Sequence, residues 1–429
     1  MTRTSLKGTN WSRDNEGFFD RWLRRLVRRD LENLDHGRLV IDDGGERLEF
    51  GRGGEDALTA TVQVRDPRFY RCLVFGGSLA AAEAYIRGYW TCDNLVDLVR
   101  IFCRNAAAAA SLESGPARLH HALSRIGHWL RRNTPSGSRR NIEAHYDLGN
   151  DFFSLFLDET MAYSCAIFPR AESTLHEASV TKFDHICRKL ALAADDHVLE
   201  IGTGWGGFAL HAAREYGCRV TTTTISRKQY EYSRRQVAAA GLADRVTVLR
   251  EDYRALTGWF DKLVSIEMIE AVGHQYFDTF FRVCSERLKP HGMMLLQAIV
   301  IPDQRYERYR RSVDFIQRYI FPGGCLPSIG AICQSLGRAT DLRISHLEDI
   351  TPHYAQTLAQ WRQRFLANAD QVRRLGFSDE FLRAWEFYFC YCEGGFRERS
   401  IGDVQILLTK PACGTTAAPR LAQGSRWAP

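Results

Sequence analysis

The stretch Val198-Leu199-Glu200-Ile201-Gly202-Thr203-Gly204-Trp205-Gly206-Gly207 decides the fold of this chain. Its first four residues have the length and apolar character of a buried strand, and four glycines follow within a tight loop. Residues 208–215 then show the periodicity of a helix with one apolar face. This order predicts the first unit of a doubly wound α/β domain, in which the loop passes close to a nucleoside and the helix N-terminus offers free amides to an anion.

The spacing of the glycines separates two classes of nucleoside-binding domain. A dinucleotide-binding loop reads G-x-G-x-x-G, whereas residues 202–207 read G-x-G-x-G-G. The second pattern is closer to the loop of S-adenosylmethionine (SAM) methyltransferases. Glycine also suits any tight turn from a strand into a helix, so the loop by itself leaves a purely structural role open.

Length and composition predict a globular protein of two or three domains. The chain has 429 residues, of which 45% are hydrophobic and 25% are charged. No run of about 18 apolar residues is present, and the first residues lack the apolar core of a signal peptide. Twelve cysteines without C-x-x-C pairs or zinc spacing predict reduced thiols, a cytoplasmic protein and no metal site.

Positive charge is concentrated in the first third of the chain. Residues 1–140 contain 23 Lys and Arg against 17 Asp and Glu, whereas residues 141–429 contain 34 of each kind. Within this part, residues 17–33 predict a basic amphipathic helix, which either packs on its own domain or contacts an anionic membrane surface. Its expected apolar face comprises Phe18, Phe19, Trp22, Leu23, Leu26 and Val27.

Changes of periodicity divide the chain into four parts. Residues 1–104 predict an α+β accessory domain, with a small antiparallel sheet over 37–64 followed by helices. Residues 105–140 predict a linker that ends in a polar stretch with Pro, Gly and Ser. Strands and helices alternate over 141–410, which predicts a parallel sheet with ligands at the carboxyl ends of its strands. Residues 411–429 predict a disordered tail.

Several separated motifs mark the second half of the chain. They are His145-Tyr146-Asp147-Leu148-Gly149-Asn150-Asp151-Phe152-Phe153, Tyr163-Ser164-Cys165, the loop 202–207, Glu270-Ala271-Val272-Gly273 and the residues Ile-Phe-Pro-Gly-Gly-Cys-Leu-Pro-Ser at 320–328. In this order they resemble the cyclopropane-fatty-acyl-phospholipid synthase family. The likeness extends over about residues 141–410, and it implies a Rossmann-like class I SAM methyltransferase domain with helical additions, preceded by the small α+β domain.

The resemblance implies a reaction on membrane phospholipids. SAM would donate a methyl group to the cis double bond of an unsaturated acyl chain, and a base would remove a proton from that methyl group as a cyclopropane ring closes. In the family this base is a bound bicarbonate ion. The family also implies a homodimer, and the basic first third favours a peripheral contact with the inner face of the membrane. An apolar acyl chain needs an apolar pocket, and the aromatic-rich residues 303–392 are its expected wall, with ordinary core packing as the alternative.

The resemblance also implies which residues bind each part of SAM. The residues expected at its methionine part are Tyr163, Ser164, Gly202, Gly204 and Gly206. The residues expected at its ribose and adenine are Thr224, Gln229, Asp252 and Tyr253. From the residues alone, Thr224 is an ordinary β-branched strand residue.

The expected bicarbonate pocket differs from that of the best-known family members. The residues that match it are Cys165, Glu270, Ile299 and Tyr354, each of which also has a plain packing role as an alternative. Gln297 and Ala271 stand where the best-known members have histidines. Glutamine donates hydrogen bonds but carries no charge and relays no proton, so ring closure is the step that these differences affect. Whether Glu267, a second carboxylate three residues before Glu270, compensates for them is left open.

Three alternatives to ring formation follow. A hydride shift and deprotonation would give a methylene- or methyl-branched acyl chain. A methyltransferase for small molecules or nucleic acid could use the basic first third to hold a polyanion, although we expect no nucleic-acid partner. A lipid-binding protein without activity is the third, and the intact glycine loop argues against it.

Overall fold

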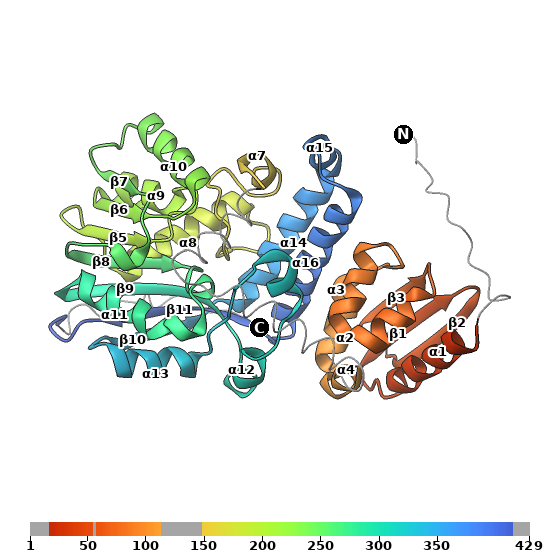
Figure 1. Ribbon diagram of the computed structural model, residues 1–429. Helices are drawn as coiled ribbons and strands as arrows, with labels where there is room; N and C mark the ends of the chain where they lie inside the picture. The colour runs from red at the N-terminus through yellow and green to blue at the C-terminus, as the bar shows by residue number, and fades with distance from the viewer. Residues whose placement is uncertain (1–16, 55–56, 113–147, 415–429) are drawn as a thin grey trace. The chain divides into compact units, whose positions relative to one another are not determined.

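The computed structural model describes residues 17–54, 57–112 and 148–414 (Figure 1). The chain divides into two compact units. The first unit contains the N-terminal part together with residues 312–320 and 366–400, and the second contains the remaining residues. Each unit is therefore built from segments that are far apart in the sequence.

A four-stranded sheet with the order β2-β1-β3-β4 forms the first unit. Its strands are β1 (Gly37–Asp43), β2 (Glu46–Arg52), β3 (Thr59–Val64) and β4 (Trp90–Cys92). β1 pairs antiparallel with β2, but it pairs parallel with β3. The expectation of a purely antiparallel sheet over 37–64 is wrong for this pair. Because the β1–β2 hairpin reverses the chain, the next strand runs in the direction of β1 and joins the other edge of β1.

The helices of the first unit come from both ends of the chain. They are α1 (Phe18–Leu31), α2 (Arg68–Ile86), α3 (Leu95–Arg104), α4 (Ala106–Leu112), α15 (Ala369–Arg374) and α16 (Asp379–Arg397). α16 packs against α2 and α3, and Glu398 accepts hydrogen bonds from Arg100 at 2.8 Å and Arg104 at 2.7 Å. The expected division into 1–104 and 141–410 does not include this return of the chain.

The expected linker and tail lie largely outside the described residues. α4 occupies the first residues of the expected linker 105–140, because Asn105 ties it to the turn before β1 by accepting from the backbone N–H groups of Asp35 and His36. Residues 113–140 of the linker and residues 415–429 of the expected tail are not described.

The basic helix predicted near the N-terminus is α1, and its aliphatic and aromatic residues differ in burial. Leu23 and Val27 are buried, whereas the exposed fractions of Phe18, Phe19 and Trp22 are 79%, 48% and 44%. The predicted apolar face is therefore buried only in part: α1 packs on α2 and α4, while the aromatic rings at its N-terminal end remain exposed. Among the described residues, no helix is long and apolar enough to span a membrane.

The second unit contains the predicted doubly wound sheet, with the strand order β10-β11-β9-β8-β5-β6-β7. Its strands are β5 (His197–Ile201), β6 (Arg219–Thr223), β7 (Val246–Leu249), β8 (Phe260–Ile266), β9 (Leu288–Val300), β10 (Arg343–Asp349) and β11 (Gly402–Thr409). β5 to β9 pair parallel, and β11 lies antiparallel between β9 and β10. The parallel sheet expected from the alternating pattern is confirmed over its first five strands.

Helices cover both faces of this sheet because successive strand residues point to opposite sides. Val198 and Val264 pack with one set of helices, and their neighbours Leu199 and Leu263 pack with the other. The first set comprises α8 (Leu175–Lys189), α9 (Gly207–Tyr216) and α10 (Arg227–Ala239). The second comprises α11 (Phe277–Arg287) and α13 (Ile329–Ala339). The remaining helices of this unit are α7 (Asn150–Phe153), α12 (Asp303–Tyr309) and most of α14 (Thr351–Ala367).

Truncating a buried side chain of α1 should lower the free energy of unfolding more than truncating an exposed one. Leu23→Ala removes a side chain that is 0% exposed, so we expect the free energy of unfolding to fall by about 2 to 5 kcal/mol. Phe18→Ala truncates a ring that is 79% exposed and should change it by less than about 0.5 kcal/mol. Urea denaturation of the full chain measures both, and equal losses would contradict the packing described for α1.

Candidate active site

The glycine loop leads from β5 into α9 through left-handed backbone conformations. Gly202, Gly204 and Gly206 have φ angles of 106°, 52° and 91°, which side chains with a Cβ rarely adopt. A Cβ at Gly202 would lie 3.2 Å from the Met268 side chain, whereas one at Gly204 would have no neighbouring atom within 4 Å. The loop thus leaves room beside Gly204 near the N-terminus of α9, which fits the close approach of a ligand such as SAM.

The residues predicted at the ribose meet at the end of β6. The Thr224 hydroxyl donates to Gln229 Oε1 at 2.8 Å, and both side chains are buried. The hydroxyl of the preceding Thr223 donates to the Glu251 carbonyl at 2.6 Å. The structure therefore brings Thr224 and Gln229 together, and their contact with a ribose remains a prediction.

The residues predicted at the adenine follow β7, the next strand of the sheet. The Asp252 carboxylate accepts hydrogen bonds from the Arg254 guanidinium at 2.7 and 2.6 Å, and the Tyr253 ring packs edge-on against Phe280 at 5.5 Å. Asp252 is thus paired with a cation on its own turn, and its place at the adenine remains a prediction. Because β5, β6 and β7 are parallel neighbours, all these residues lie at one edge of the sheet.

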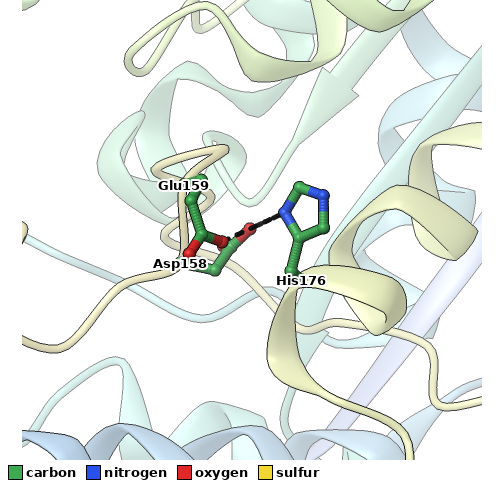
Figure 2. Close-up of side chains that lie close together, drawn as sticks. All are labelled: Asp158, Glu159 and His176. Atoms are coloured by element: carbon green, nitrogen blue, oxygen red, sulfur yellow. Dashed lines mark hydrogen bonds and ion pairs between the residues drawn. The ribbon is translucent and has the colours of Figure 1, made fainter.

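The segment that carries Tyr163 and Ser164 is anchored by Asp158. The buried Asp158 carboxylate accepts from the hydroxyls of Thr160 at 3.0 Å and Ser179 at 3.1 Å. Figure 2 shows His176 directed at Asp158 and Glu159, with Nδ1 lying 3.2 Å from an oxygen of each. Since the Asp158 oxygens already have protein partners, this cluster is explained as an anchor for the loop to residue 165.

Tyr163 and Ser164 have different surroundings. The Tyr163 ring packs against Phe153 at 5.3 Å and Trp361 at 5.2 Å. The Ser164 hydroxyl accepts a hydrogen bond from the ammonium group of Lys182 at 2.6 Å, and Lys182 is fully buried. Burial lowers the pKa of Lys182, and the negative charge of Glu267 opposes this shift. Lys182 was not predicted, because a lysine within an amphipathic helix gives no sign of its burial.

Glu267 lies at the centre of the predicted bicarbonate pocket. Its Oε1 accepts hydrogen bonds from the Cys165 backbone N–H at 2.7 Å and from the Gln297 amide at 2.8 Å. Its Oε2 accepts one from the Tyr354 hydroxyl at 2.7 Å. Three predicted residues are therefore brought together around a carboxylate whose role the sequence left open.

The backbone of Glu267 is strained. Its φ is 47°, a left-handed conformation that costs a residue with a Cβ about 1–2 kcal/mol. Among the described residues, the other non-glycine residues with positive φ are Met161, Ala191 and Arg399. The Glu267 N–H donates to the Gln297 carbonyl at 2.9 Å, which ties the strained residue to β9. Strain at a residue of this kind is a reason to look for function there.

Glu270 lies on the short turn η3 (Ile269–Ala271), close to Glu267. Its Oε1 accepts from the Ile299 backbone N–H at 2.6 Å, and its Oε2 is buried without a hydrogen-bond partner within the described structure. Burial and, secondly, the charge of Glu267 raise the pKa of Glu270 to about 8. Glu270 therefore holds a proton at neutral pH, and Ile299 contributes its backbone amide.

A buried polar layer continues from Gln297 onto β11. Gln297 Oε1 accepts from the Gln405 amide at 3.0 Å, and Gln405 Oε1 accepts from the Lys189 ammonium at 2.7 Å. Asp403 is also buried, with an oxygen 3.4 Å from the Gln297 amide nitrogen. Burial and the charge of Glu267 raise the pKa of Asp403 well above its usual range, while burial raises that of the Cys165 thiol.

Asp403 and Gln405 belong to this layer and were not predicted from the sequence. They occupy alternate positions on β11, directly opposite Ile299 and Gln297 of β9. Two polar residues at alternate positions of an otherwise apolar strand were the available signal, because that spacing places them on one face.

The expected aromatic wall over 303–392 is divided between the units. Tyr354 and Trp361 of α14 pack edge-on at 6.1 Å in the second unit. Phe315 and Phe387 pack at 4.9 Å in the first unit. Only part of this region therefore adjoins the predicted site residues within the second unit.

The model of a family described as mycolic acid cyclopropane synthetase matches residues 134–406. The chain belongs to this family. The tuberculostearic acid methyltransferase UfaA1 of Mycobacterium tuberculosis is 38% identical over 385 residues, which cover 87% of each chain. The cyclopropane-fatty-acyl-phospholipid synthase of Escherichia coli is 36% identical over 380 residues, covering 86% of this chain and 95% of that protein.

Solved structures agree with the family. The mycolic acid cyclopropane synthase CmaA1, complexed with SAH and CTAB, matches with a TM-score of 0.60 and 33% identity, covering 63% of this chain and 98% of that one. The predicted class I SAM methyltransferase fold with a preceding small sheet domain is confirmed. Membership of the family makes the chain a SAM-dependent methyltransferase that modifies fatty acyl chains.

Glu200, next to the glycine loop, provides a test of burial at this edge of the sheet. Burial raises its pKa from 4.5 to about 8, although Thr222 Oγ1 lies 2.6 Å from the carboxylate. At pH values between 4.5 and 8, Glu200 keeps its proton in the native chain but has lost it in the unfolded chain. The free energy of unfolding should therefore fall as pH rises from about 4.5 to 8, by on the order of 1 kcal/mol per pH unit.

Glu200→Gln should remove this contribution. We expect the difference in unfolding free energy between variant and wild type, measured by urea denaturation at several pH values from 5 to 8, to change in favour of the variant as pH rises. A difference that is constant over this range would contradict the raised pKa.

Proposed function

We propose that this chain transfers a methyl group from SAM to the cis double bond of an unsaturated acyl chain in a membrane phospholipid. The observation that carries the proposal is the position of the Glu267 pocket beside the glycine loop, since Met268 packs against Gly202. The family and the phospholipid substrate in the name of the E. coli relative support it.

The chain's own residues would bind the cofactor and accept a proton. SAM, when bound, supplies an electrophilic methyl group. Its methionine part would lie at Tyr163, Ser164 and the three loop glycines, and its nucleoside at Thr224, Gln229, Asp252 and Tyr253. Methylation of an alkene leaves an acidic carbocation, so a weak base suffices if it is well placed. The pocket formed by Cys165, Glu270 and Tyr354 offers such a place.

Two products are compatible with this reaction. Proton loss with ring closure gives the cyclopropane that the sequence resemblance implies. A hydride shift before proton loss gives a methylene branch, and we favour this outcome for two reasons. UfaA1, whose product carries a methyl branch, covers as much of this chain as the E. coli relative does. Gln297 is also fully buried and bonded to Glu267 and Gln405, so this position offers no imidazole to the ring-closing step.

Lipid analysis distinguishes the products. We would express the full chain in a bacterial host without its own cyclopropane synthase and analyse the fatty acid methyl esters. Both products add one CH₂ to the unsaturated parent, so chromatographic retention against standards and proton NMR must separate a ring from an exocyclic methylene. We expect the methylene-branched ester. A ring would return the function to cyclopropane formation, and unchanged lipids would contradict methylation of phospholipid acyl chains.

We further propose that the N-terminal end of α1 contacts the anionic surface of the membrane that holds the substrate. Phe19 stacks with Trp22 at 5.9 Å and with Phe75 at 6.3 Å, and all three rings are exposed. The exposed Arg21 and Arg25 flank them on α1. Aromatic rings beside arginines suit the headgroup boundary, where each arginine contributes about 1 kcal/mol. We call Phe18, Phe19, Trp22 and Phe75 the aromatic tip.

Vesicle binding tests the aromatic tip. We expect the full chain to sediment with phosphatidylglycerol vesicles more strongly than with phosphatidylcholine vesicles, and Phe18→Ser with Trp22→Ser to weaken binding at least about tenfold. Ile344→Ser, which removes an exposed apolar side chain of β10 in the second unit, is the matched control and should bind as wild type does. Equal losses in both variants, or preferential binding of RNA, would contradict this contact.

A further inference from the structure

The donors expected to hold bicarbonate are already used by side chains of this chain. The Cys165 N–H, the Gln297 amide and the Tyr354 hydroxyl donate to Glu267. The Ile299 N–H donates to Glu270. A bicarbonate ion placed among these groups would have to displace a protein carboxylate from every one of them. The residues present therefore do not fit this ion.

The charges around the pocket also disfavour a bound bicarbonate ion. Glu267, Glu270 and Asp403 already bring three carboxyl groups together, and the charge of Glu267 acts on both of the others. The buried cation that faces this cluster is Lys182, whose ammonium donates to Ser164. Because Glu270 and Asp403 hold protons, the charge that would repel a further anion is that of Glu267, which already occupies three of the donors.

We propose that the Glu267 carboxylate takes the place of the bicarbonate ion and accepts the proton from the newly transferred methyl group. The inference rests on the proposed function and names the base of that reaction. Glu267 is partly exposed, whereas Cys165, Gln297 and Tyr354, which hold it, are buried. The three donors thus position a carboxylate that a substrate can still reach. The left-handed backbone at residue 267 is maintained in spite of its strain, as expected for a residue held in place for its function.

The proton balance is the same for both products. The alkene π pair forms the bond to the methyl carbon while the sulfur–carbon bond breaks and leaves its electron pair on sulfur. For a ring, a methyl C–H pair then forms the third ring bond. For a methylene branch, the C–H pair forms the exocyclic double bond after the hydride shift. In both cases the proton passes to Glu267, which becomes neutral and releases it to solvent before the next turnover.

Two substitutions at residue 267 distinguish the role of the carboxylate as a base from its role in filling the pocket. Glu267→Gln keeps the shape of the side chain, so the amide still fills the pocket but accepts no proton. Glu267→Gly empties the pocket and suits the left-handed backbone, and the relief of strain offsets part of the cost of the three lost hydrogen bonds. Ala191→Gly is the matched control, because it relieves another positive φ, of 50°, in the turn after α8.

Turnover with and without bicarbonate tests the proposal in the full chain. We expect wild type and Ala191→Gly to keep their rates within about twofold in buffer freed of carbon dioxide, since their base belongs to the protein. Glu267→Gln and Glu267→Gly should lose at least about 100-fold. Added millimolar bicarbonate should restore at least about tenfold in Glu267→Gly, where it can enter, and nothing in Glu267→Gln. Wild type that stops without bicarbonate, or a Glu267→Gln variant that keeps its rate, would overturn the proposal.

A binding measurement tests the role of Glu267 independently of whether the chain methylates phospholipids. Carbon-13 NMR of labelled bicarbonate, with the chain saturated by S-adenosylhomocysteine, should show binding to Glu267→Gly and none to wild type. Bicarbonate bound to wild type would overturn the inference. If wild type methylates no lipid, the proposed function fails, and the binding measurement still decides whether Glu267 fills the anion's place.

Discussion

Buried negative charge is the constraint on which this site depends. Glu267, Glu270 and Asp403 lie together where water cannot solvate them fully, so each needs either hydrogen-bond donors or a proton. Glu267 has three donors, while the raised pKa values of Glu270 and Asp403 keep their protons bound. The pairing of β11 with β9 and the turn after β8 bring these groups together. The strand order of the sheet thus determines the electrostatics of the pocket.

The features predicted from sequence are those with a local signal. The glycine loop, the alternating strands and the helical faces depend on residues within one turn or one strand of each other, and the structure has them. The parallel pairing of β1 with β3 and the return of residues 366–400 to the first unit depend on distant segments. The periodicity within one segment does not indicate which other segment that segment will pack against.

The candidate site shows the same division. The family resemblance identified Cys165, Gln297 and Tyr354, and these residues do meet although they are separated by more than 50 residues in sequence. The role of Glu267, which they surround, was left open, because its placement depends on the positive φ of this residue. Lys182 and Asp403 escaped notice because only burial distinguishes them from solvent-exposed charges. The carboxylate of Asp252 is paired with Arg254, and its predicted contact with the adenine remains a prediction.

The return of the chain through α16 has a consequence for biosynthesis. α2 and α3 emerge from the ribosome early, but the helix that packs on them comes almost 300 residues later. The N-terminal unit therefore stays incompletely packed until translation is nearly finished, and β11 inserts between β9 and β10 of the larger sheet later still. Removing the N-terminal residues would uncover the face of α16 that carries Phe387 and Gly394, which lie against Tyr85 of α2 and Val99 of α3. In this chain the accessory unit is therefore built from both ends of the sequence and is more than an N-terminal extension.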